Sequence, residues 1–362
     1  MSLFPQFQSL TLNGKKYHSG EIKALSEEKL NRLPEEHWET KLFGFLGEWF
    51  NDSPTIIART SGTTGKPKAI KIEKDKMLQS AMMTIRYLQL LPNDAALLCL
   101  SCGHIAGKMM VVRAFAGGLS LVSCEPCSNP LMQIPESQKI DFAAFVPLQV
   151  KEILSSFKTS NQFKQIKNVL IGGAPISPEL KNWLHRMPNA IYETYGMTET
   201  ISHVALKKLS KESNEDYFTL LNGITVESNE QDCLVIHAPY LSPEPIITSD
   251  IAELKDNRHF KWLGRADNVV NSGGVKLIPE VLEEKIRHLT SRRFFFAGKQ
   301  DEKLGERLLL VIEGDVYSED ELIELRKELS KALDKYELPK EILFVSRFRE
   351  TPEGKILKHF NQ

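Results

Sequence analysis

The chain has 362 residues, of which 41% are hydrophobic and 26% charged, and its formal net charge is −1. This length suffices for two or three domains, and the composition is that of ordinary globular proteins. The balanced charge, without a basic block, argues against nucleic acid and anionic membranes as partners. No apolar run approaches the roughly 18 residues of a membrane helix. Residues 1–11 lack the features of a signal peptide, so we expect a cytoplasmic protein.

Four of the five cysteines form two C-x-x-C pairs, at 99–102 and 124–127. Paired cysteines of this kind can bind zinc. Twenty-one residues separate the two pairs, which is just beyond the usual range, and the neighbouring segments 95–100 and 119–122 are predicted to be buried strands. Small buried thiols therefore explain these cysteines better than a zinc site.

The first half of the chain alternates between predicted strands and helices. Residues 1–54 predict a short β start, with a turn at Asn13-Gly14, and an apolar helix over 36–50. The strands expected after it cover 69–73, 95–101, 119–123, 142–146 and 168–171. The expected helices cover about 75–91 with Asp75 as N-cap, a segment ending at Ala116, 148–157, and a segment starting at Ser177-Pro178. This alternation predicts a largely parallel sheet covered on both faces, with ligands beyond the carboxyl ends of its strands.

From Ala190 onward the predicted strands dominate. They cover 204–206, 224–226, 234–237 and 246–248, which predicts a small β subdomain. The last hundred residues predict helices over 279–289 and 319–333 and strands over 293–297, 308–312 and 341–345. We therefore expect an α/β protein. Its N-terminal domain (1–264) would combine parallel-sheet layers with the β subdomain, and its C-terminal domain (265–362) would be α+β.

The segment Thr60–Lys68 reads T-S-G-T-T-G-K-P-K and follows a β-prone stretch. Its glycines free the backbone to expose N–H groups, while its hydroxyls and lysines suit a polyphosphate. The spacing differs from that of the common P-loop, and Pro67 blocks a following helix. A polar surface turn explains the same composition, so this segment alone leaves both interpretations open.

Five segments carry a resemblance to a known family. They are Thr60–Lys68, Gly172-Gly173-Ala174-Pro175, Tyr195-Gly196-Met197-Thr198-Glu199, Thr248-Ser249-Asp250 with Gly264-Arg265 and Asp267, and Gly354-Lys355. In this order the chain resembles the acyl-adenylate-forming superfamily of acyl-CoA ligases, non-ribosomal adenylation domains and luciferases. Each motif alone is weak, but all five in order, from about residue 55 to the C-terminus, are a specific signal.

The resemblance implies a ligase that uses ATP and Mg²⁺ to form an acyl-adenylate and then transfers the acyl group to CoA. It implies that ATP or AMP is bound by Thr60, Ser61, Gly62, Thr63, Thr64, Gly65, Lys68, Gly173, Ala174, Pro175, Glu193, Thr194, Tyr195, Gly196, Asp250 and Arg265. It also makes Thr198, Glu199, Lys355 and His104 the catalytic residues.

Residue chemistry agrees with these implied roles. Tyr195 would stack on adenine, and Thr198 would donate a hydrogen bond to the α-phosphate. Glu199 would hold Mg²⁺, which favours carboxylate oxygen. Asp250 would accept hydrogen bonds from both ribose hydroxyls, with help from Arg265. Taken alone, Asp250 is better explained as an ordinary turn residue, and only the set of motifs favours the role in binding ribose.

The C-terminal domain is implied to be mobile. Relatives rotate it about the position of Asp267, which would exchange Lys355 in the site for the loop Ser272-Gly273-Gly274, lining the CoA tunnel. Lys355 would bridge the acid and the α-phosphate and stabilise the charge that develops there. An exposed lysine of the chain end is the alternative for Lys355. A non-catalytic nucleotide-binding relative remains a separate hypothesis, against which these charged residues speak.

Three features narrow the resemblance to the o-succinylbenzoate–CoA ligases of menaquinone biosynthesis. They are the compact length and the segments 103–113 and 192–200. That acid is an aromatic dianion, so its second carboxylate needs a cationic or polar partner. The candidates for that partner are Lys108 and Arg113, while His104 would close over the reacting carboxylate. The two cations are about 140° apart around a helix, and Lys108 is the nearer candidate.

Other interpretations stay open. Lys108 and Arg113 are equally explained as surface or core-capping cations, and His104 as a packed histidine. A ligase for another aromatic or medium-chain acid, or one that loads a carrier-protein thiol, is the alternative function. Asn268 stands where many relatives have a second aspartate, and Ser249 replaces the glycine of Thr-Gly-Asp. Dimers are common in the superfamily, so a homodimer is possible.

Overall fold

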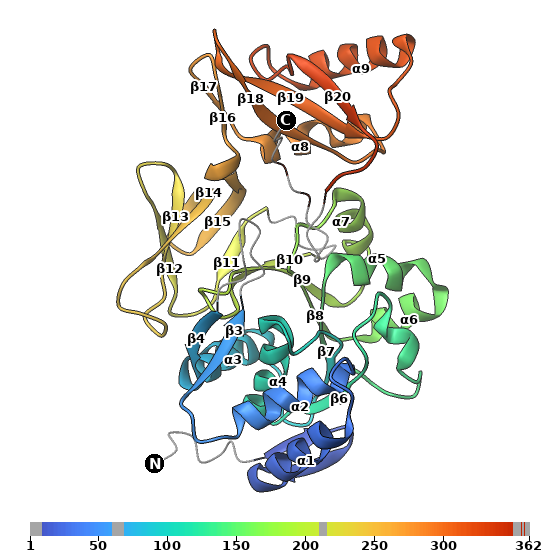
Figure 1. The fold of residues 1–362 in the computed structure, drawn as a ribbon, viewed down its shortest axis with the longest axis vertical. Coiled ribbons are helices and arrows are strands. Elements are labelled where there is room, and N and C mark those ends of the chain that lie inside the picture. The colour runs from blue at the N-terminus through green and yellow to red at the C-terminus, as the bar shows by residue number, and fades with distance from the viewer. Residues whose placement is uncertain (1–8, 60–68, 210–215, 350–355, 357, 359–362) are drawn as a thin grey trace. The chain divides into compact units, whose positions relative to one another are not determined.

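The computed structural model describes residues 9–59, 69–209, 216–349, 356 and 358 (Figure 1). The chain forms two compact units, of which the first combines Met1–Ile224 with Ala238–Glu244 and the second combines Thr225–His237 with Pro245–Gln362. The β-rich segments at 225–237 and beyond 245 thus group with the C-terminal part. The domain boundary at residue 264 stays a prediction. Within the described ranges, no helix is both long and apolar enough to cross a bilayer.

The first unit contains both helices and strands. In chain order they are β1 (Ser9–Leu12), β2 (Lys15–His18), α1 (Ser19–Arg32), α2 (Trp38–Trp49), β3 (Thr55–Arg59), β4 (Ala69–Glu73), α3 (Lys74–Leu88), β5 (Ala95–Leu98), α4 (Ile105–Gly117), β6 (Ser120–Ser123), η1 (Pro130–Gln133), β7 (Phe142–Phe145), α5 (Pro147–Ser155), α6 (Phe157–Gln165), β8 (Asn168–Ile171), α7 (Pro178–Leu184), β9 (Ala190–Gly196), β10 (His203–Lys208) and β11 (Phe218–Leu220).

The main sheet of this unit has the strand order β11-β10-β9-β8-β7-β5-β6-β1-β2. The six strands from β9 to β1 pair in parallel, and the outer strands β10, β11 and β2 pair antiparallel. Strands β5 and β8 are buried at every position, as expected for strands covered on both faces. The predicted parallel core is therefore confirmed, with antiparallel additions at its edges.

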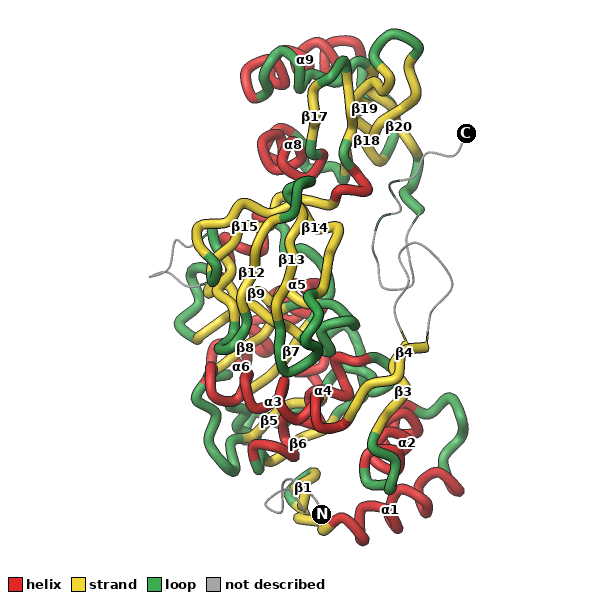
Figure 2. The backbone as a smooth tube through the Cα atoms, turned by 90° about the vertical axis from the view of Figure 1, so that its left-hand side faces the viewer, coloured by secondary structure: helices red, strands yellow, loops and turns green. Residues whose placement is uncertain are grey.

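Helices cover both faces of this sheet (Figures 1 and 2). Right-handed crossovers that run in opposite directions from the centre put α4 on one face and α5, α6 and α7 on the other. On the second face, Leu97 and Phe145 of the sheet form one buried cluster with Val150, Phe163 and Leu184 of the helices. Helix α4 packs on β1, β5 and β6, and ten successive residues of it are buried. A helix buried on all sides must accommodate any charged residue inside the protein.

Two helices differ from the sequence-based expectation at their starts. Helix α2 begins at Trp38, because the His37 ring accepts a hydrogen bond from the Glu39 amide at 3.3 Å. Helix α3 begins at Lys74, with Glu73 as its N-cap, so the prediction of Asp75 as the cap was wrong. Asp75 lies in the first turn, where a carboxylate interacts favourably with the helix dipole.

The expected helix over 148–157 is also corrected. It is two helices, α5 and α6, and the break lies at Ser156, whose φ of −107° and ψ of 130° are extended. This residue ends one helix and caps the next. The strand expected over 95–101 ends at Leu98, so the residues up to His104 form the connection to α4.

The second unit contains two sheets. Its elements are β12 (Thr225–Ser228), β13 (Cys233–His237), β14 (Ile246–Asp256), β15 (His259–Arg265), η2 (Ala266–Asn268), β16 (Val270–Ser272), β17 (Val275–Leu277), α8 (Pro279–Ile286), η3 (Arg287–Leu289), β18 (Phe294–Asp301), β19 (Gly305–Glu313), α9 (Glu319–Ala332) and β20 (Glu341–Val345).

Strands β12 to β15 form an antiparallel meander, which contains three of the predicted β segments, 224–226, 234–237 and 246–248. The fourth, 204–206, lies in β10 of the first unit instead, so the predicted grouping is confirmed only in part. The other sheet has the order β17-β16-β19-β18, with β20 parallel to β19. Helices α8 and α9 pack on it through a buried cluster that includes Leu282, Ile286, Phe296 and Leu329. The last hundred residues thus combine helices with a mostly antiparallel sheet, as expected for an α+β domain.

The close packing of α4 against the chain before it provides a stability test. A Cβ at Gly107 would lie 2.3 Å from the carbonyl oxygen of Ser101, a backbone atom that cannot rotate away. We expect Gly107→Ala to lower the free energy of unfolding by about 1–3 kcal/mol through overpacking. At Gly44 in α2 no atom lies within 4 Å of an added Cβ, so Gly44→Ala should stabilise by about 0.5–1 kcal/mol. Urea denaturation measures both, and equal effects would contradict the packing argument.

Candidate active site

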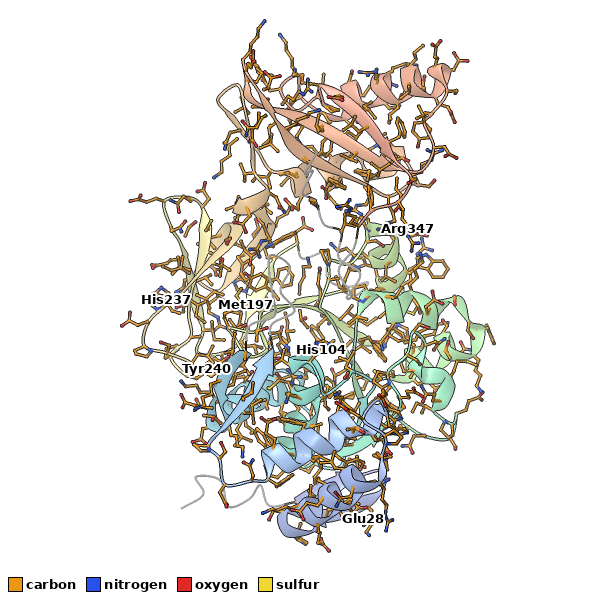
Figure 3. All side chains as sticks on the ribbon, viewed as in Figure 1. Glu28, His104, Met197, His237, Tyr240 and Arg347 are labelled. Atoms are coloured by element: carbon orange, nitrogen blue, oxygen red, sulfur yellow. The ribbon has the colours of Figure 1, made fainter. Side chains whose placement is uncertain are left out.

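Loops with predicted site residues meet at the carboxyl edge of the first unit's sheet. Because β5, β7, β8 and β9 are parallel, the segments that follow them leave from the same edge. These segments contain His104, the turn 172–175 and the turn 197–200 (Figure 3 labels His104 and Met197). The Gln149 amide, which donates to the Cys99 carbonyl at 3.2 Å, ties the segment after β7 to the segment after β5.

The turn after β8 lies directly against β9. A Cβ at Gly172 would lie 2.1 Å from the Thr194 hydroxyl, so only glycine leaves room for that side chain. Gly173 has a φ of +85°, in the left-handed region that favours glycine. Ala174 is half-buried and Pro175 is exposed. The sequence predicted that a glycine here permits a close approach, and within the chain the approaching group is Thr194.

The strand β9 carries three of the predicted nucleotide-binding side chains, those of Glu193, Thr194 and Tyr195. Tyr195 is half-buried, and its ring lies 5.9 Å from that of Phe218. Glu193 is buried and forms an ion pair with Lys207 at 2.7 Å. This ion pair joins β9 to β10, in which Glu193 and Lys207 face each other, and the predicted contact of Glu193 with the nucleotide stays a prediction. At Gly196 a Cβ would lie 2.5 Å from the His203 Cα, which explains the glycine.

The turn that follows β9 holds the remaining predicted catalytic residues of this unit. Thr198 is half-buried and Glu199 is exposed. The Ile201 amide donates to the Thr198 carbonyl at 2.9 Å, which closes the turn. An accessible carboxylate is the donor chemistry that Mg²⁺ prefers, so Glu199 fits its predicted role. In the described ranges no cluster of three or more His, Cys, Asp or Glu side chains is arranged for a metal.

The three residues of α4 that sequence reasoning assigned to the acid lie in different surroundings. His104 is exposed at the N-cap position of the helix. Lys108 is buried, pairs with the Glu48 carboxylate at 3.1 Å, and lies 4.6 Å from the centre of the Phe45 ring. Its charge is therefore compensated inside the protein. This differs from the expectation that Lys108 is the nearer candidate for a ligand.

Arg113 is buried among neutral groups. It is 3% exposed, and its guanidinium donates to the Ser202 hydroxyl and lies 3.5 Å from the His203 Nδ1. Its Nη1 is 3.9 Å from the Met110 sulfur, and its Nε has no hydrogen-bond partner. Burial lowers the pKa of Arg113 to about 10, so the side chain stays charged at neutral pH. No described carboxylate forms an ion pair with it.

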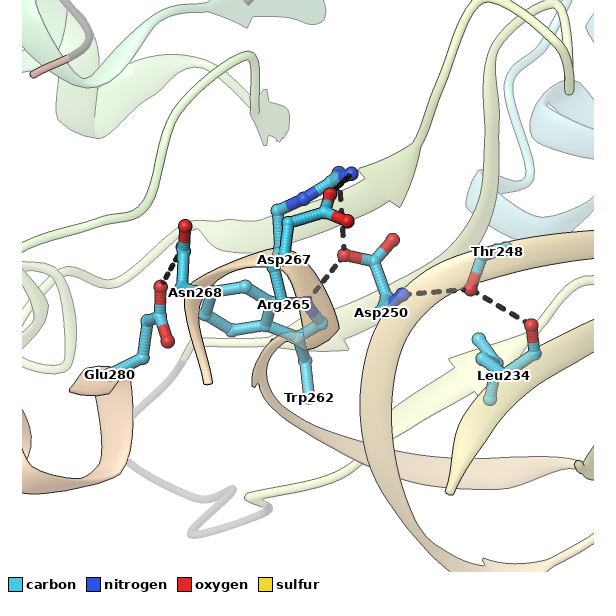
Figure 4. Close-up of polar contacts among 8 residues, drawn as sticks. All are labelled: Leu234, Thr248, Asp250, Trp262, Arg265, Asp267, Asn268 and Glu280. Carbon is cyan, nitrogen blue, oxygen red and sulfur yellow. Dashed lines mark hydrogen bonds and ion pairs between the residues drawn. The ribbon is translucent and has the colours of Figure 1, made fainter. Parts of the chain in front are cut away.

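The second unit brings Asp250 and Arg265 together, as the sequence predicted (Figure 4). The two residues face each other in the β14–β15 register, and Arg265 Nη1 lies 3.9 Å from Asp250 Oδ1. The Trp262 indole donates to the same carboxylate oxygen at 3.0 Å. The Thr248 hydroxyl accepts from the Asp250 amide at 3.0 Å and donates to the Leu234 carbonyl at 2.8 Å. Asp250 is therefore held by both its backbone and its side chain.

Asp267, the predicted hinge position, is exposed and pairs with Arg265 at 2.8 Å. The next residue, Asn268, donates to the Glu280 carboxylate at 2.6 Å (Figure 4). Lys358 lies 3.3 Å from Glu280 and 2.7 Å from the buried Glu283. A single cluster of one amide and three charged groups therefore links η2, α8 and the residue three positions after Lys355.

The predicted CoA-tunnel residues form a tight hairpin between β16 and β17. Ser272 pairs with Val275, so Gly273 and Gly274 are the two loop residues, with φ values of +58° and +84°. Both positive angles match the type I′ hairpin turn, which favours glycine pairs. The hairpin alone thus accounts for these glycines.

Two groups of predicted site residues lie outside the described ranges. They are the phosphate loop (Thr60, Ser61, Gly62, Thr63, Thr64, Gly65 and Lys68) and Lys355. The strands β3 and β4 on either side of the loop pair antiparallel, with Arg59 opposite Ala69. The predicted strand before the loop is therefore confirmed, and the roles of these residues stay predictions.

Sequence reasoning missed Trp262, Ser202 and His203. Trp262 lies three residues before Arg265, and a buried indole N–H usually finds an acceptor, which was a usable signal. Ser202 and His203 follow the Tyr195–Glu199 motif by only a few residues. Their pairing with Arg113, about 90 residues earlier in the chain, could not be predicted from either local sequence.

His203 is buried, and desolvation, followed by the nearby Arg113 charge, moves its pKa well below the usual value of 6.5. The unfolded chain therefore binds a proton that the folded protein rejects, so stability falls as the pH decreases below about 6.5. We expect His203→Gln to reduce this loss, by up to ~1.4 kcal/mol for each pH unit. Urea denaturation between pH 7 and pH 5 measures the difference. His18→Gln, at an exposed position, is the control, and identical pH profiles for wild type and His203→Gln would refute the assignment.

Comparison with known proteins identifies the family. A profile of the AMP-binding enzymes matches residues 17–225. A solved acyl-CoA synthetase (AMP-forming)/AMP-acid ligase II-like protein from Dyadobacter fermentans DSM 18053 is 36% identical, with a TM-score of 0.63 over 92% of this chain and 95% of that one. The 2-succinylbenzoate–CoA ligase of Lactococcus lactis is 25% identical over 84% of this chain and 69% of its own length. E. coli MenE, 19% identical, has the same fold, with a TM-score of 0.71 over 94% of this chain and 93% of its own. The expected resemblance is confirmed: the chain belongs to the AMP-binding enzymes, the adenylate-forming acid–CoA ligases.

Proposed function

We propose that this ligase activates o-succinylbenzoate (2-succinylbenzoate) and transfers it to CoA, as a step of menaquinone biosynthesis. The observation that carries the proposal is the buried Arg113 guanidinium, which has no carboxylate partner in the described part of the chain. The name that several relatives 23–25% identical to this chain bear, 2-succinylbenzoate–CoA ligase, supports the same acid.

The energetics of Arg113 favour an acid with a second negative charge. Removing an ion from water costs several kcal/mol even after the protein relaxes, unless an opposite charge compensates it. The contacts of Arg113 with Ser202, His203 and Met110 are all to groups without a charge, since the lowered pKa keeps His203 neutral. A carboxylate of the substrate would supply the missing charge, and Arg113 matches it with paired N–H donors.

Lys108 is the weaker candidate for the same task. Its ammonium already pairs with Glu48 and lies over the Phe45 ring. A second carboxylate near Lys108 would approach Glu48 and be repelled by it. The proposal therefore assigns the second carboxylate of the acid to Arg113, and assigns His104, exposed before the same helix, to the neighbourhood of the reacting carboxylate.

The reaction proceeds in two steps. An oxygen of the acid's carboxylate attacks the α-phosphorus of ATP, a new O–P bond forms, and the bond to pyrophosphate breaks. The CoA thiol then attacks the acyl carbon of the mixed anhydride, AMP leaves with the former carboxylate oxygen, and the thiol proton is released. The first step depends mostly on positioning and on neutralising charge.

Residues of the first unit are assigned to the phosphates and the adenine. The Thr198 hydroxyl would donate to the α-phosphate, and Glu199 would hold Mg²⁺, which supplies positive charge near the phosphates. The Tyr195 ring would stack on adenine beside the chain at Gly173 and Ala174. The phosphate loop Thr60–Lys68 would bind the β- and γ-phosphates through its amides, hydroxyls and lysines.

Residues of the second unit are assigned to the ribose and to the transfer. Asp250 would accept hydrogen bonds from the two ribose hydroxyls. Trp262, which donates to Asp250 at 3.0 Å, keeps the carboxylate in one orientation, and Arg265 adds a donor beside it. Lys355 would neutralise charge during adenylation. The hairpin Ser272–Gly274 would contact the CoA arm after rotation about Asp267.

The acid specificity tests the role of Arg113. For Arg113→Met we expect kcat/KM with o-succinylbenzoate to fall about 10- to 100-fold, because hydrogen bonds to charged groups contribute ~1.5–3 kcal/mol. Activity with benzoate, which has no second carboxylate, should change little. Pyrophosphate release from Mg-ATP across o-succinylbenzoate, benzoate, 4-coumarate and octanoate measures both. In the wild type, release with another acid and none with o-succinylbenzoate would overturn the proposed substrate. A greater loss of that specificity in Lys108→Met than in Arg113→Met would assign the second carboxylate to Lys108 instead.

Measuring adenylation and transfer to CoA separately tests whether Lys355 acts in adenylation alone. In Lys355→Ala, acid-dependent pyrophosphate release should fall about 100- to 1,000-fold, because charge stabilisation in the transition state is lost. Transfer to CoA from supplied acyl-adenylate should stay within a few-fold of wild type. Lys335→Ala removes an exposed lysine of the same unit and serves as the control. Equal losses in both half-reactions would contradict a role confined to adenylation.

A further inference from the structure

We propose that Thr200 and Ser202 are positioning residues that couple the buried Arg113 to the Thr198–Glu199 turn. Through them, an acid whose second carboxylate reaches Arg113 aligns the groups assigned to the α-phosphate and Mg²⁺. The inference rests on the function proposed above and adds to it a physical route from substrate recognition to the adenylation step. All its residues belong to the first unit.

The Thr200 side chain closes the turn from inside the protein. Its hydroxyl accepts from the Met197 amide at 2.9 Å, and the Thr200 amide donates to the Met197 carbonyl at 3.2 Å. Thr198 and Glu199 lie between these two residues. Because Thr200 is 0% exposed, water does not compete for its hydroxyl. The Thr200 hydroxyl is therefore a buried side-chain group that helps the two backbone hydrogen bonds to fix the orientation of Thr198 and Glu199.

The same hydroxyl connects the turn to the next segment. It lies 2.7 Å from the Ser202 carbonyl and 3.0 Å from the Met197 carbonyl, to either of which its single proton can be donated. The Tyr240 hydroxyl donates to the Thr200 carbonyl at 3.3 Å and fixes the backbone from the other side. Tyr240 and Met197 are both labelled in Figure 3. Thr200 thus holds the turn and the Ser202 backbone together.

Ser202 and His203 continue the chain of contacts to Arg113. The Arg113 guanidinium donates to the Ser202 hydroxyl and lies 3.5 Å from the His203 Nδ1. Because arginine can only donate, Nδ1 is the acceptor, and the proton of the neutral ring is on Nε2. The Nε2 atom lies 3.0 Å from the Thr84 hydroxyl, which donates in turn to the Ser80 carbonyl at 3.3 Å. The direction of every hydrogen bond from Arg113 into α3 is therefore determined.

Ile201, which connects Thr200 to Ser202, has a constrained backbone. It is 3% exposed and has a φ of +67°. A β-branched residue in this left-handed conformation is strained and persists only where its surroundings impose it. Here the bonds of Thr200 and Ser202 act on both sides, and Gly196 permits the Ser202 carbonyl to pass where a Cβ would lie 2.5 Å away. The segment 200–202 therefore behaves as a rigid link.

The consequence is a coupling between the proposed acid site and the turn. A carboxylate bound to Arg113 would compete with Ser202 and His203 for the N–H groups of the guanidinium. The resulting change in the position of Ser202 would pass through residues 200–202 to Thr198 and Glu199. Such a coupling acts on the rate of adenylation, whereas binding of the acid alone would change only KM. Acids with a second carboxylate would therefore be adenylated faster than acids without one, and the enzyme would select its substrate by this rate.

Thr200→Val tests the positioning role, because valine keeps the shape and β-branch of threonine but lacks the hydroxyl. We expect kcat for acid-dependent pyrophosphate release to fall about 10- to 100-fold, since a small misplacement of a catalytic group has effects of this size. KM for the acid and transfer from supplied acyl-adenylate should stay within a few-fold of wild type. Thr200→Ser, which restores the hydroxyl, should recover most of kcat. Wild-type kcat in Thr200→Val, or no recovery in Thr200→Ser, would overturn the inference.

A double-mutant cycle tests the coupling to Arg113. Ser202→Ala alone should lower the ratio of kcat values for o-succinylbenzoate and benzoate about 3- to 10-fold, as expected for the loss of one hydrogen bond. In the Arg113→Met background the same change should have almost no effect on the ratio. Additive losses would show that Ser202 acts independently and would refute the coupling. If the wild type uses a different acid, the proposed substrate fails, while the Thr200 variants still test the positioning role with that acid.

Discussion

The first unit is organised around one buried charge, that of Arg113, with which no carboxylate of the described residues forms an ion pair. Ten successive residues of helix α4 are buried, so the guanidinium of Arg113 lies inside the protein, with hydroxyl, imidazole and thioether neighbours. Neutral acceptors satisfy some N–H groups but leave the positive charge, which favours any arrangement that brings an anion to it. Lys108, one and a half turns earlier on the same helix, shows the opposite solution, since Glu48 neutralises it. The contrast between the two buried cations on one helix separates a structural ion pair, at Lys108, from the group to which we assign the ligand, at Arg113.

The topology of the sheet explains why this charge lies beside the segment that follows the Thr198–Glu199 turn. In a doubly wound sheet the chain leaves each parallel strand at the same edge, so the residues after β5, β8 and β9 converge although many residues separate them in sequence. Helix α4 starts at that edge and runs below it, while β10 returns antiparallel beside β9. Ser202 and His203, at the start of β10, contact Arg113 inside the protein. One reversal of direction therefore joins the exposed turn to the interior.

The sequence predicted those features that depend on the residues of one short segment or on a known motif. The alternating strands and helices, the glycine turn after β8 and the pairing of Asp250 with Arg265 follow from periodicity or from motif spacing. Features that depend on residues distant in sequence were missed: the compensation of Lys108 by Glu48, the contacts of Arg113 with Ser202 and His203, and the indole of Trp262 on Asp250. The split of the helix at Ser156 was missed although serine is a weak helix former that favours cap positions, because this preference does not say where a backbone turns extended.

The carboxylates of α8 in the second unit explain why position 268 is an asparagine. Glu280 and Glu283 share the single ammonium of Lys358, and burial raises the pKa of Glu283 against the opposing effect of that ammonium. Two carboxylates on one cation leave a negative excess. A carboxylate at 268, as many relatives have, would face Glu280 and enlarge this excess, whereas the Asn268 amide donates to Glu280 and reduces it. The change from the family pattern beside the proposed hinge is therefore matched to the carboxylates of α8, which also hold the chain three residues beyond Lys355.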